Sequence, residues 1–385
     1  MPLITTTKDL KAFCTRLKKA EFITVDTEFI RERTYWARLC LIQVAGPDEA
    51  FAIDPLAEGI DLSPLYELFL NKKILKVFHA CRQDLEIFFK EMDGKLPTPV
   101  FDTQIASMVC GFGEQVSYEM LVNALLKKQL DKSSRFTDWA QRPLTAKQMK
   151  YALSDVTYLR TIYEKLVAKI EKQKRGSWIK DEFKNLIDKE NFIFRPAEAW
   201  ERIKVPSNKP RVLGVLKEIA AWREQTAQNA DVPRGRILKD EALVEIALHM
   251  PPSKEALGKM RSMQHGFAES EKGQQLLEAV KRGMEMPEKE LPQREARPHF
   301  PPGLAPTIDL LRVLLKLKCE ESHVASKLLA NAADLELIAA YGEKADVAAL
   351  SGWRFKVFGK EALELRDGKL ALAIQDNKLK LVEAS

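Results

Sequence analysis

Two acidic residues near the N-terminus have the types and spacing that metal-dependent chemistry requires. Asp26 and Glu28 lie two positions apart at the end of an apolar stretch, residues 22–27, that reads as a β-strand. Side chains two apart on a strand point to the same face of the sheet. Carboxylates in such apolar surroundings need a cation, either a metal ion or Lys/Arg. The alternative is a strand end at which both acids are simply solvated.

Two further acids lie on segments that read as helices. Asp84 follows a buried-type strand, residues 74–79, and opens a helix, where an acid can also act merely as a charge partner for the helix N-terminus. Tyr151 and Asp155 lie four apart on a later helix and therefore share one of its faces. A plain hydrogen-bonded Tyr–Asp pair is the alternative for these two residues.

The four acids together favour a divalent-metal site over four separate structural roles. Convergent carboxylates suit hard cations such as Mg²⁺ or Mn²⁺, and two such ions would offset four negative charges. Sites of this kind hold their ions ~3.5–4 Å apart and catalyse in-line displacement at phosphorus. We assign Tyr151 the role of orienting the attacking water, because a phenol with an ordinary pKa of about 10 is a poor base at neutral pH.

These residues require a mixed set of strands and helices to position them. Residues 36–45 and 50–53 read as strands that form an antiparallel meander with the first one. The clearest local signal is the capping box of Thr145 and Gln148, which begins the helix that carries Asp155.

Beyond about residue 200 the strand signals nearly vanish and helical spacing dominates. Residues 286–306 are rich in proline and read as a linker between two helical parts. An apolar triplet of the first part recurs in the second at a constant offset, with Leu243, Ile246 and Ala247 followed by Leu335, Ile338 and Ala339. This recurrence is consistent with a duplicated domain, and it is equally consistent with two unrelated small bundles that have the same leucine spacing.

The composition excludes several classes of protein. Of the 385 residues, 45% are hydrophobic and 30% charged, which rules out a mainly disordered chain. The net charge is only +6, so any basic surface for nucleic acid must be local, within residues 165–239. The five cysteines form no CxxC pair, which argues against a disulfide scaffold or a zinc ribbon. Without a membrane-spanning run or a signal-peptide pattern, we expect a cytoplasmic protein with no membrane partner.

Three stretches around the acids resemble the exonuclease motifs of the DEDD superfamily. They read VDTEFIRERTYW, FHACRQDLEIF and MKYALSDVTYL. The third has the pattern Y-x-x-x-D, whereas the sister subgroup carries His where Lys150 stands here, so the Tyr subgroup is indicated. The segment DKSSRFTDWAQRPLT at 131–145 is similar to the stretch that marks the bacterial ribonuclease D family, and FDTQIAS (101–107) and AIDPLA (52–57) agree with it.

The resemblance implies a fold, a reaction and a set of site residues. The fold would be the α/β ribonuclease H-like exonuclease fold, a mixed sheet flanked by helices. The reaction would be 3′→5′ hydrolysis of RNA that releases nucleoside 5′-monophosphates, and the substrates would be tRNA precursors and other small structured RNAs with 3′ trailers. Asp26, Glu28, Asp84 and Asp155 would hold two divalent ions, Mg²⁺ or Mn²⁺, and Tyr151 would assist the water.

The helical remainder resembles two all-α bundles of the helicase-and-RNase-D C-terminal (HRDC) type. The segment PRGRIL at 233–238 is the most family-like part, whereas the second copy has only scattered matches. The expected organisation is an exonuclease domain with a helical extension at 1–200, a first HRDC domain at 205–290, a Pro-rich linker at 291–303 and a second, divergent HRDC-like domain at 304–385.

A set of aromatic and basic residues are candidates for contact with the substrate. They are Phe29, Trp36, Lys132, Arg135, Arg142, Arg234, Arg236 and Lys239. The two aromatic residues could stack on a terminal base or pack in the core. The basic residues before the third motif could contact phosphate or lie on solvated surface. Those in the first HRDC domain could bind the RNA backbone or form ordinary surface salt bridges.

Two other functions stay open on the sequence. One is a 3′→5′ exodeoxyribonuclease of the same fold, because contacts to the 2′-hydroxyl distinguish RNA from DNA and no residue reveals them. The other is a non-catalytic RNA-binding scaffold, against which the intact set of acids argues. No obligate protein partner is implied.

Overall fold

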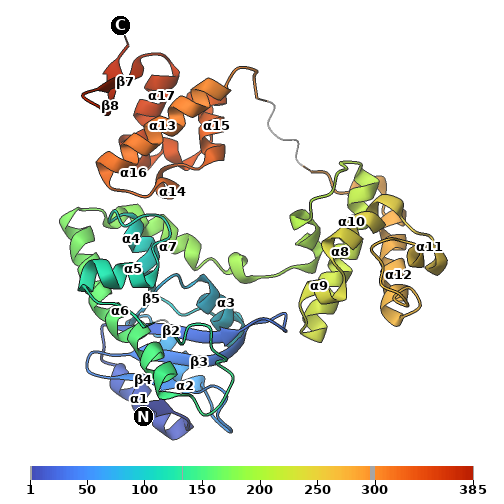
Figure 1. Ribbon diagram of the computed structural model, residues 1–385, viewed down its shortest axis with the longest axis horizontal. Coiled ribbons are helices and arrows are strands. Elements are labelled where there is room, and N and C mark those ends of the chain that lie inside the picture. The colour runs from blue at the N-terminus through green and yellow to red at the C-terminus, as the bar shows by residue number, and fades with distance from the viewer. Residues whose placement is uncertain (1, 132, 295–299, 385) are drawn as a thin grey trace. The chain divides into compact units, whose positions relative to one another are not determined.

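The computed structural model describes residues 2–131, 133–294 and 300–384. The chain divides into two compact units, each discontinuous in sequence (Figure 1). Unit 1 comprises Met1–Glu28, Leu39–Asn191 and Pro298–Ser385, and unit 2 comprises Phe29–Arg38 and Phe192–Arg297. This grouping differs from the sequence-based domains, since the C-terminal segment belongs to the same unit as the expected exonuclease domain.

Unit 1 is built around a six-stranded mixed sheet. Its strands are Leu3–Ile4 (β1), Phe22–Ile30 (β2), Arg38–Ala45 (β3), Ala50–Ile53 (β4), Leu75–Phe78 (β5) and Val100–Asp102 (β6). Their order in the sheet is β1-β4-β3-β2-β5-β6. Strand β3 runs antiparallel to β4, while the β1–β4, β2–β5 and β5–β6 pairs are parallel. The mixed sheet agrees with the expected fold class.

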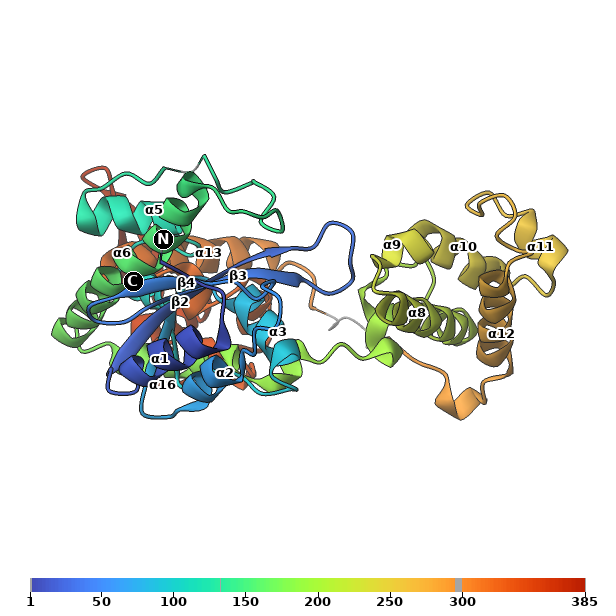
Figure 2. The same ribbon diagram turned by 90° about the horizontal axis from the view of Figure 1, so that it is seen from below.

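Helices cover both sides of this sheet. They are Thr7–Leu17 (α1), Ser63–Leu70 (α2), Arg82–Glu91 (α3), Thr103–Met108 (α4), Tyr118–Leu121 (α5), Ala146–Lys172 (α6) and Lys180–Leu186 (α7). Helices α1 and α2 lie on one side and α5 on the other (Figure 2). Helix α6 begins as predicted, because both hydrogen bonds of the Thr145–Gln148 capping box are formed. Within the described ranges, no helix combines the length and the apolar character that crossing a bilayer would demand.

The C-terminal part of unit 1 is a helical bundle that ends in a β-hairpin. Its elements are Ala305–Ser322 (α13), Ser326–Leu329 (α14), Ala332–Tyr341 (α15), Gly352–Arg354 (α16), Lys360–Arg366 (α17), Leu370–Gln375 (β7) and Lys378–Glu383 (β8). The prediction of an all-α second bundle is therefore wrong for its last residues. Asp376 and Asn377, both with positive φ, form the two-residue turn between antiparallel β7 and β8, which is the conformation that a tight hairpin favours.

The C-terminal bundle and the exonuclease part share one hydrophobic core. Leu314 and Ile338 of the bundle belong to the same cluster of buried side chains as Leu159 and Ile162 of α6. Polar contacts accompany this packing: the Arg354 side chain donates to Glu182 at 2.9 Å. Burial of apolar surface from both parts stabilises them as one unit.

Unit 2 is helical. Its α-helices are Pro210–Ala230 (α8), Arg234–Ile237 (α9), Asp240–His249 (α10), Lys254–Gly258 (α11) and Glu271–Glu285 (α12). The loop between β2 and β3 belongs to this unit, because the Tyr35 hydroxyl donates to the buried Glu224 and its ring packs with Ala227 and Ile237. The proline-rich linker falls partly on residues 295–299, which lie outside the described residues.

Candidate active site

Strand β2 presents two acids on the face that meets α6. Asp26 and Glu28 alternate with the fully buried Ile23 and Val25, as expected for a strand with one face in the core. On the same face as the acids, Thr24 donates its hydroxyl hydrogen to the carbonyl oxygen of Val156 at 2.8 Å. This bond joins β2 to α6 one residue after Asp155 and fixes the distance between the two elements.

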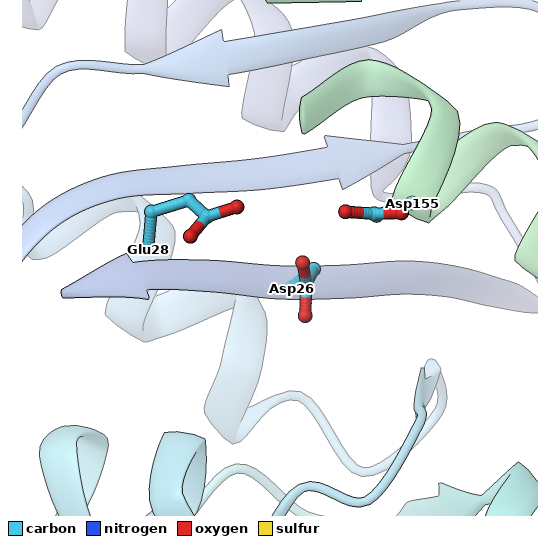
Figure 3. A group of neighbouring side chains, drawn as sticks. All are labelled: Asp26, Glu28 and Asp155. Carbon is cyan, nitrogen blue, oxygen red and sulfur yellow. The ribbon is translucent and has the colours of Figure 1, made fainter. Parts of the chain in front are cut away.

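Asp26, Glu28 and Asp155 form a compact group of carboxylates. One carboxylate oxygen from each lies within 4.8 Å of those of the other two, and the three side chains converge from β2 and α6 (Figure 3). Acids that lie far apart along the sequence are thus brought to one point by the pairing of a strand with a helix.

Asp84 lies beside this group and is held by a different contact. It is buried in the first turn of α3, and its carboxylate accepts a hydrogen bond from the Thr27 hydroxyl. Asp102 stabilises the turn before α3. Its carboxylate accepts hydrogen bonds from the backbone N–H groups of Ala80 and Cys81, both at 2.9 Å. Neither Thr27 nor Asp102 was among the residues predicted from the sequence, although Asp102 lies in the FDTQIAS segment.

Tyr151 hydrogen-bonds to Asp155 from the preceding turn of α6. Its ring also lies near that of Trp139, with centroids 6.1 Å apart. Burial and the negative charges of Asp155, Glu28 and Asp26 raise the pKa of the Tyr151 phenol. The hydroxyl therefore stays protonated and acts as a hydrogen-bond donor, not as a base.

The acids disfavour one another's charged forms. Burial raises the pKa of Asp155 to about 7, against the opposing effects of the Tyr151 hydrogen bond and of Arg135. Burial, followed by the charges of Asp155 and Asp84, raises the pKa of Glu28 to about 9. The pKa of Asp84 rises to about 6, chiefly through burial, and that of Asp26 is raised by burial and by all three neighbouring carboxylates.

This set of donors fits divalent metal ions. Buried, mutually repelling carboxylates need a positive charge among them, and oxygen ligands of this kind suit hard cations. Arg135, which is exposed, lowers the pKa of Glu28 and of Asp155, but one exposed guanidinium does not balance four carboxylates. The site is therefore a candidate divalent-metal site.

The other candidates from the loop before α6 have different surroundings. Arg142 forms a salt bridge with the buried Asp54 at 2.6 Å and also donates to the carbonyl oxygen of Cys40, so its partners are structural. Arg135 is exposed and lies over the ring of Phe136. Lys132 lies outside the described residues.

The remaining candidates fall in unit 2. Trp36 packs on Tyr35 with ring centroids 4.7 Å apart, and Arg234 pairs with the buried Glu224 at 3.3 Å. These contacts agree with the packing and salt-bridge alternatives. Phe29 follows Glu28 on β2 and points to the opposite face. Arg236 and Lys239 are exposed.

Comparison with known proteins identifies the family of this chain. A family model described as a 3′-5′ exonuclease matches residues 1–171, and an HRDC domain model matches residues 212–280. The chain is 47% identical to ribonuclease D of Nitrobacter hamburgensis over the full length of both chains, and 50% identical to ribonuclease D of Jannaschia sp. over 99% of each. The chain belongs to the ribonuclease D family.

A solved structure of the ribonuclease D family has the same fold. Escherichia coli RNase D, described as an exoribonuclease involved in structured RNA processing, superimposes with a TM-score of 0.80 at 30% identity and covers 94% of this chain and 97% of its own. The DEDD resemblance and the first HRDC domain are thereby confirmed. A second HRDC domain is not matched. Neither an exodeoxyribonuclease nor a non-catalytic scaffold is supported by these ribonuclease D relatives.

Proposed function

We propose that this ribonuclease D family member, a metal-dependent 3′→5′ exoribonuclease, trims 3′ extensions from tRNA precursors and other small structured RNAs. The observation that carries the proposal is the convergence of Asp26, Glu28 and Asp155, with carboxylate oxygens within 4.8 Å of one another. The name of the E. coli relative, which refers to structured RNA, supports the substrate class.

The four acids and the Tyr151 phenol would have different roles at this site. Asp26, Glu28, Asp84 and Asp155 would hold two divalent ions, Mg²⁺ or Mn²⁺, which supply positive charge at the scissile phosphate and a water of lowered pKa. The Tyr151 hydroxyl, protonated and hydrogen-bonded to Asp155, would orient the attacking water. Displacement of the 3′ oxygen would release a nucleoside 5′-monophosphate.

Exposed basic residues would guide the RNA. Arg135 is the best placed candidate in unit 1, because its charge acts on Glu28 and Asp155. Arg236 and Lys239 of the HRDC domain are exposed and could bind phosphates without breaking structural contacts. The proposal places the enzyme in the cytoplasm and needs no obligate protein partner.

The C-terminal bundle would be a second, divergent HRDC-like domain with a structural role. Helices α13, α14 and α15 repeat the pattern of α8, α9 and α10: the first helix of each set ends at a residue with positive φ, His323 and Asp231 respectively. Where α9 carries Arg234 and Arg236, α14 carries Ser326 and Leu328. Ser326 donates to Glu114 of the exonuclease part, so this surface would serve docking instead of RNA binding.

Digestion of a matched pair of substrates tests the proposal. An RNA and a DNA oligonucleotide, both of the trailer sequence, and a tRNA that carries this 3′ trailer are incubated with the full chain and Mg²⁺ or Mn²⁺, and then with a chelator. We expect stepwise shortening of the RNA from its 3′ end, release of 5′-monophosphates and complete loss of activity with chelator. Preference for the DNA, or activity that survives Asp26→Asn, would refute the assignment.

A further inference from the structure

Phe136 is an apolar side chain that the fold leaves in water. It is 90% exposed, more than any other large hydrophobic residue in the parts of the chain that the structure describes. A lone exposed apolar side chain needs no explanation by itself. Its position relative to the acid cluster must therefore decide whether the exposure has a function.

A tight turn holds Phe136 at its outer corner. The carbonyl oxygen of Ser134 accepts hydrogen bonds from both the backbone N–H of Thr137, at 3.3 Å, and its hydroxyl, at 2.7 Å. Arg135 and Phe136 occupy the two central positions of this turn, while Ser134 is buried. The backbone thus anchors one end of the turn and directs the two central residues outward.

The turn is attached to the helix that carries the catalytic residues. The Gln148 side chain donates to the Thr137 hydroxyl at 3.2 Å, and Trp139 packs near Tyr151. The charge of Arg135 acts on Asp155, whose pKa it lowers. These contacts place the turn beside the acid cluster, at the start of α6.

One face of the Phe136 ring already makes a cation–π contact. The Arg135 guanidinium lies over the ring, 5.1 Å from its centroid. The side chain's high exposure leaves the other face to solvent. An aromatic ring beside a positive charge is the arrangement that proteins use to hold unpaired nucleotides, with the base stacked on the ring.

We propose that Phe136 is a substrate-binding residue whose open face stacks on an unpaired base of the RNA close to its 3′ end. This inference rests on the proposed function, since it assumes that RNA enters the acid cluster by its 3′ end. It adds a base contact that neither the acids nor the basic residues provide.

An abasic substrate series tests the contact directly. Single-stranded RNAs with one abasic nucleotide at each of the last four positions are compared with the intact RNA, using the full chain with Phe136 or with Phe136→Ala. Affinity is measured in an Asp26→Asn background, and KM and kcat in the otherwise native chain. On intact RNA we expect Phe136→Ala to raise Kd and KM by roughly 5- to 150-fold and to change kcat less.

The stacking contact requires a specific pattern in this series. At one abasic position the effect of Phe136→Ala should disappear, because the base that the ring contacts is already missing. Phe136→Trp should retain affinity, and Phe136→Leu, which keeps an apolar side chain without a ring, should lose it. Ile374→Ala, at another highly exposed apolar position, 78% exposed on β7, is the matched control and should leave KM unchanged.

Failure of this inference can be told apart from failure of the proposed function. If the native chain does not shorten RNA, the proposed function is wrong. If it does, but Phe136→Ala binds intact RNA normally, or Phe136→Leu binds as well as the native chain, or the loss persists at every abasic position, the stacking contact is refuted. A change in oligomeric state with unchanged RNA affinity would also overturn it, since the ring would then contact a second copy of the chain.

Discussion

The indole rings of Trp178 and Trp353 stack face to face, with centroids 4.2 Å apart and an interplanar angle of 4°. Trp178 lies just before α7, and Trp353 lies on α16 of the C-terminal bundle, so the pair links two distant segments of unit 1. We predict that Trp353→Ala lowers the free energy of unfolding by about 2–3 kcal/mol, measured by urea denaturation. Trp353→Phe keeps an aromatic ring and should lower the free energy of unfolding less than Trp353→Ala does. Equal losses in the two variants would show that stacking contributes nothing to stability.

Arg142 should support stability more than substrate binding. Its guanidinium neutralises the buried Asp54 and also holds the Cys40 carbonyl oxygen. Arg142→Ala leaves Asp54 buried without its partner, and we expect a loss of about 2–4 kcal/mol in unfolding free energy. The KM for RNA should change little at a temperature where the variant is folded. A raised KM with an unchanged melting temperature would instead assign Arg142 to the substrate.

Thr27 should set the metal affinity of the site through Asp84. Its hydroxyl donates to the Asp84 carboxylate and thereby lowers the pKa of that carboxyl. Thr27→Val removes the donor at similar volume, so Asp84 should hold its proton to higher pH and bind metal less well. We expect the metal concentration for half-maximal activity to rise by roughly 10- to 100-fold. Thr27→Ser keeps the hydroxyl and should stay close to the native value; a similar loss in both variants would exclude this mechanism.

Tyr151 should act on the chemical step alone. Tyr151→Phe removes the donor to Asp155 and keeps the ring beside Trp139. We expect kcat to fall by about 10²-fold or more, with the Kd for RNA unchanged. Tyr118→Phe is the matched control, because the Tyr118 hydroxyl donates to the backbone carbonyl oxygen of Ser154 at 2.9 Å, next to Asp155. Equal effects of the two variants would point to a general packing role.

The metal-free enzyme should lose stability as the pH rises. In the folded chain the pKa is about 7 for Asp155 and about 9 for Glu28, well above the values of unfolded carboxyls. Between about pH 5 and 9 the folded form therefore binds more protons than the unfolded form, and the free energy of unfolding falls with rising pH.

Divalent metal should remove much of this pH dependence. Its binding requires deprotonated ligands, so Mg²⁺ should raise the melting temperature more at pH 8.5 than at pH 5.5. Calorimetry with and without chelator measures how the melting temperature changes with pH in the metal-free and the metal-bound enzyme. Asp155→Asn should reduce the pH dependence of the metal-free enzyme. Parallel slopes with and without metal would contradict the proposed ligand set.

The sequence predicted those parts of the site whose signals are local. The capping box at Thr145 locates the start of α6, and strand alternation places Asp26 and Glu28 on one face. That Asp155 lies beside Asp26 and Glu28 was inferred only from the chemistry that the acids share. In the structure, the contact between β2 and α6 brings these side chains together. Thr27 gave no signal, because a β-branched residue in a strand is ordinary and its bond to Asp84 spans two elements.

The C-terminal part was the least predictable. Two short segments flank the turn pair Asp376-Asn377: residues 370–374 are all apolar, and residues 378–381 alternate lysine with leucine. Two such segments around a turn pair are a hairpin signal, yet the helical spacing before them favoured an all-helical domain. The part of the chain against which the C-terminal bundle packs could not be predicted either. Periodicity identifies Leu314 as buried but does not indicate whether it packs within its own bundle or against α6.

The discontinuity of unit 1 has a consequence for how the enzyme is made. The strand and helices that carry the acids emerge from the ribosome first, then the long segment Phe192–Arg297 of unit 2, and after it the leucines of α13 that complete the shared core of unit 1. Until those final helices arrive, apolar side chains of the early segments stay uncovered, a state that favours aggregation and chaperone binding. A nuclease with a complete core therefore forms only after the helices from α13 onward have been synthesised, so nascent chains that still lack these helices are the least mature.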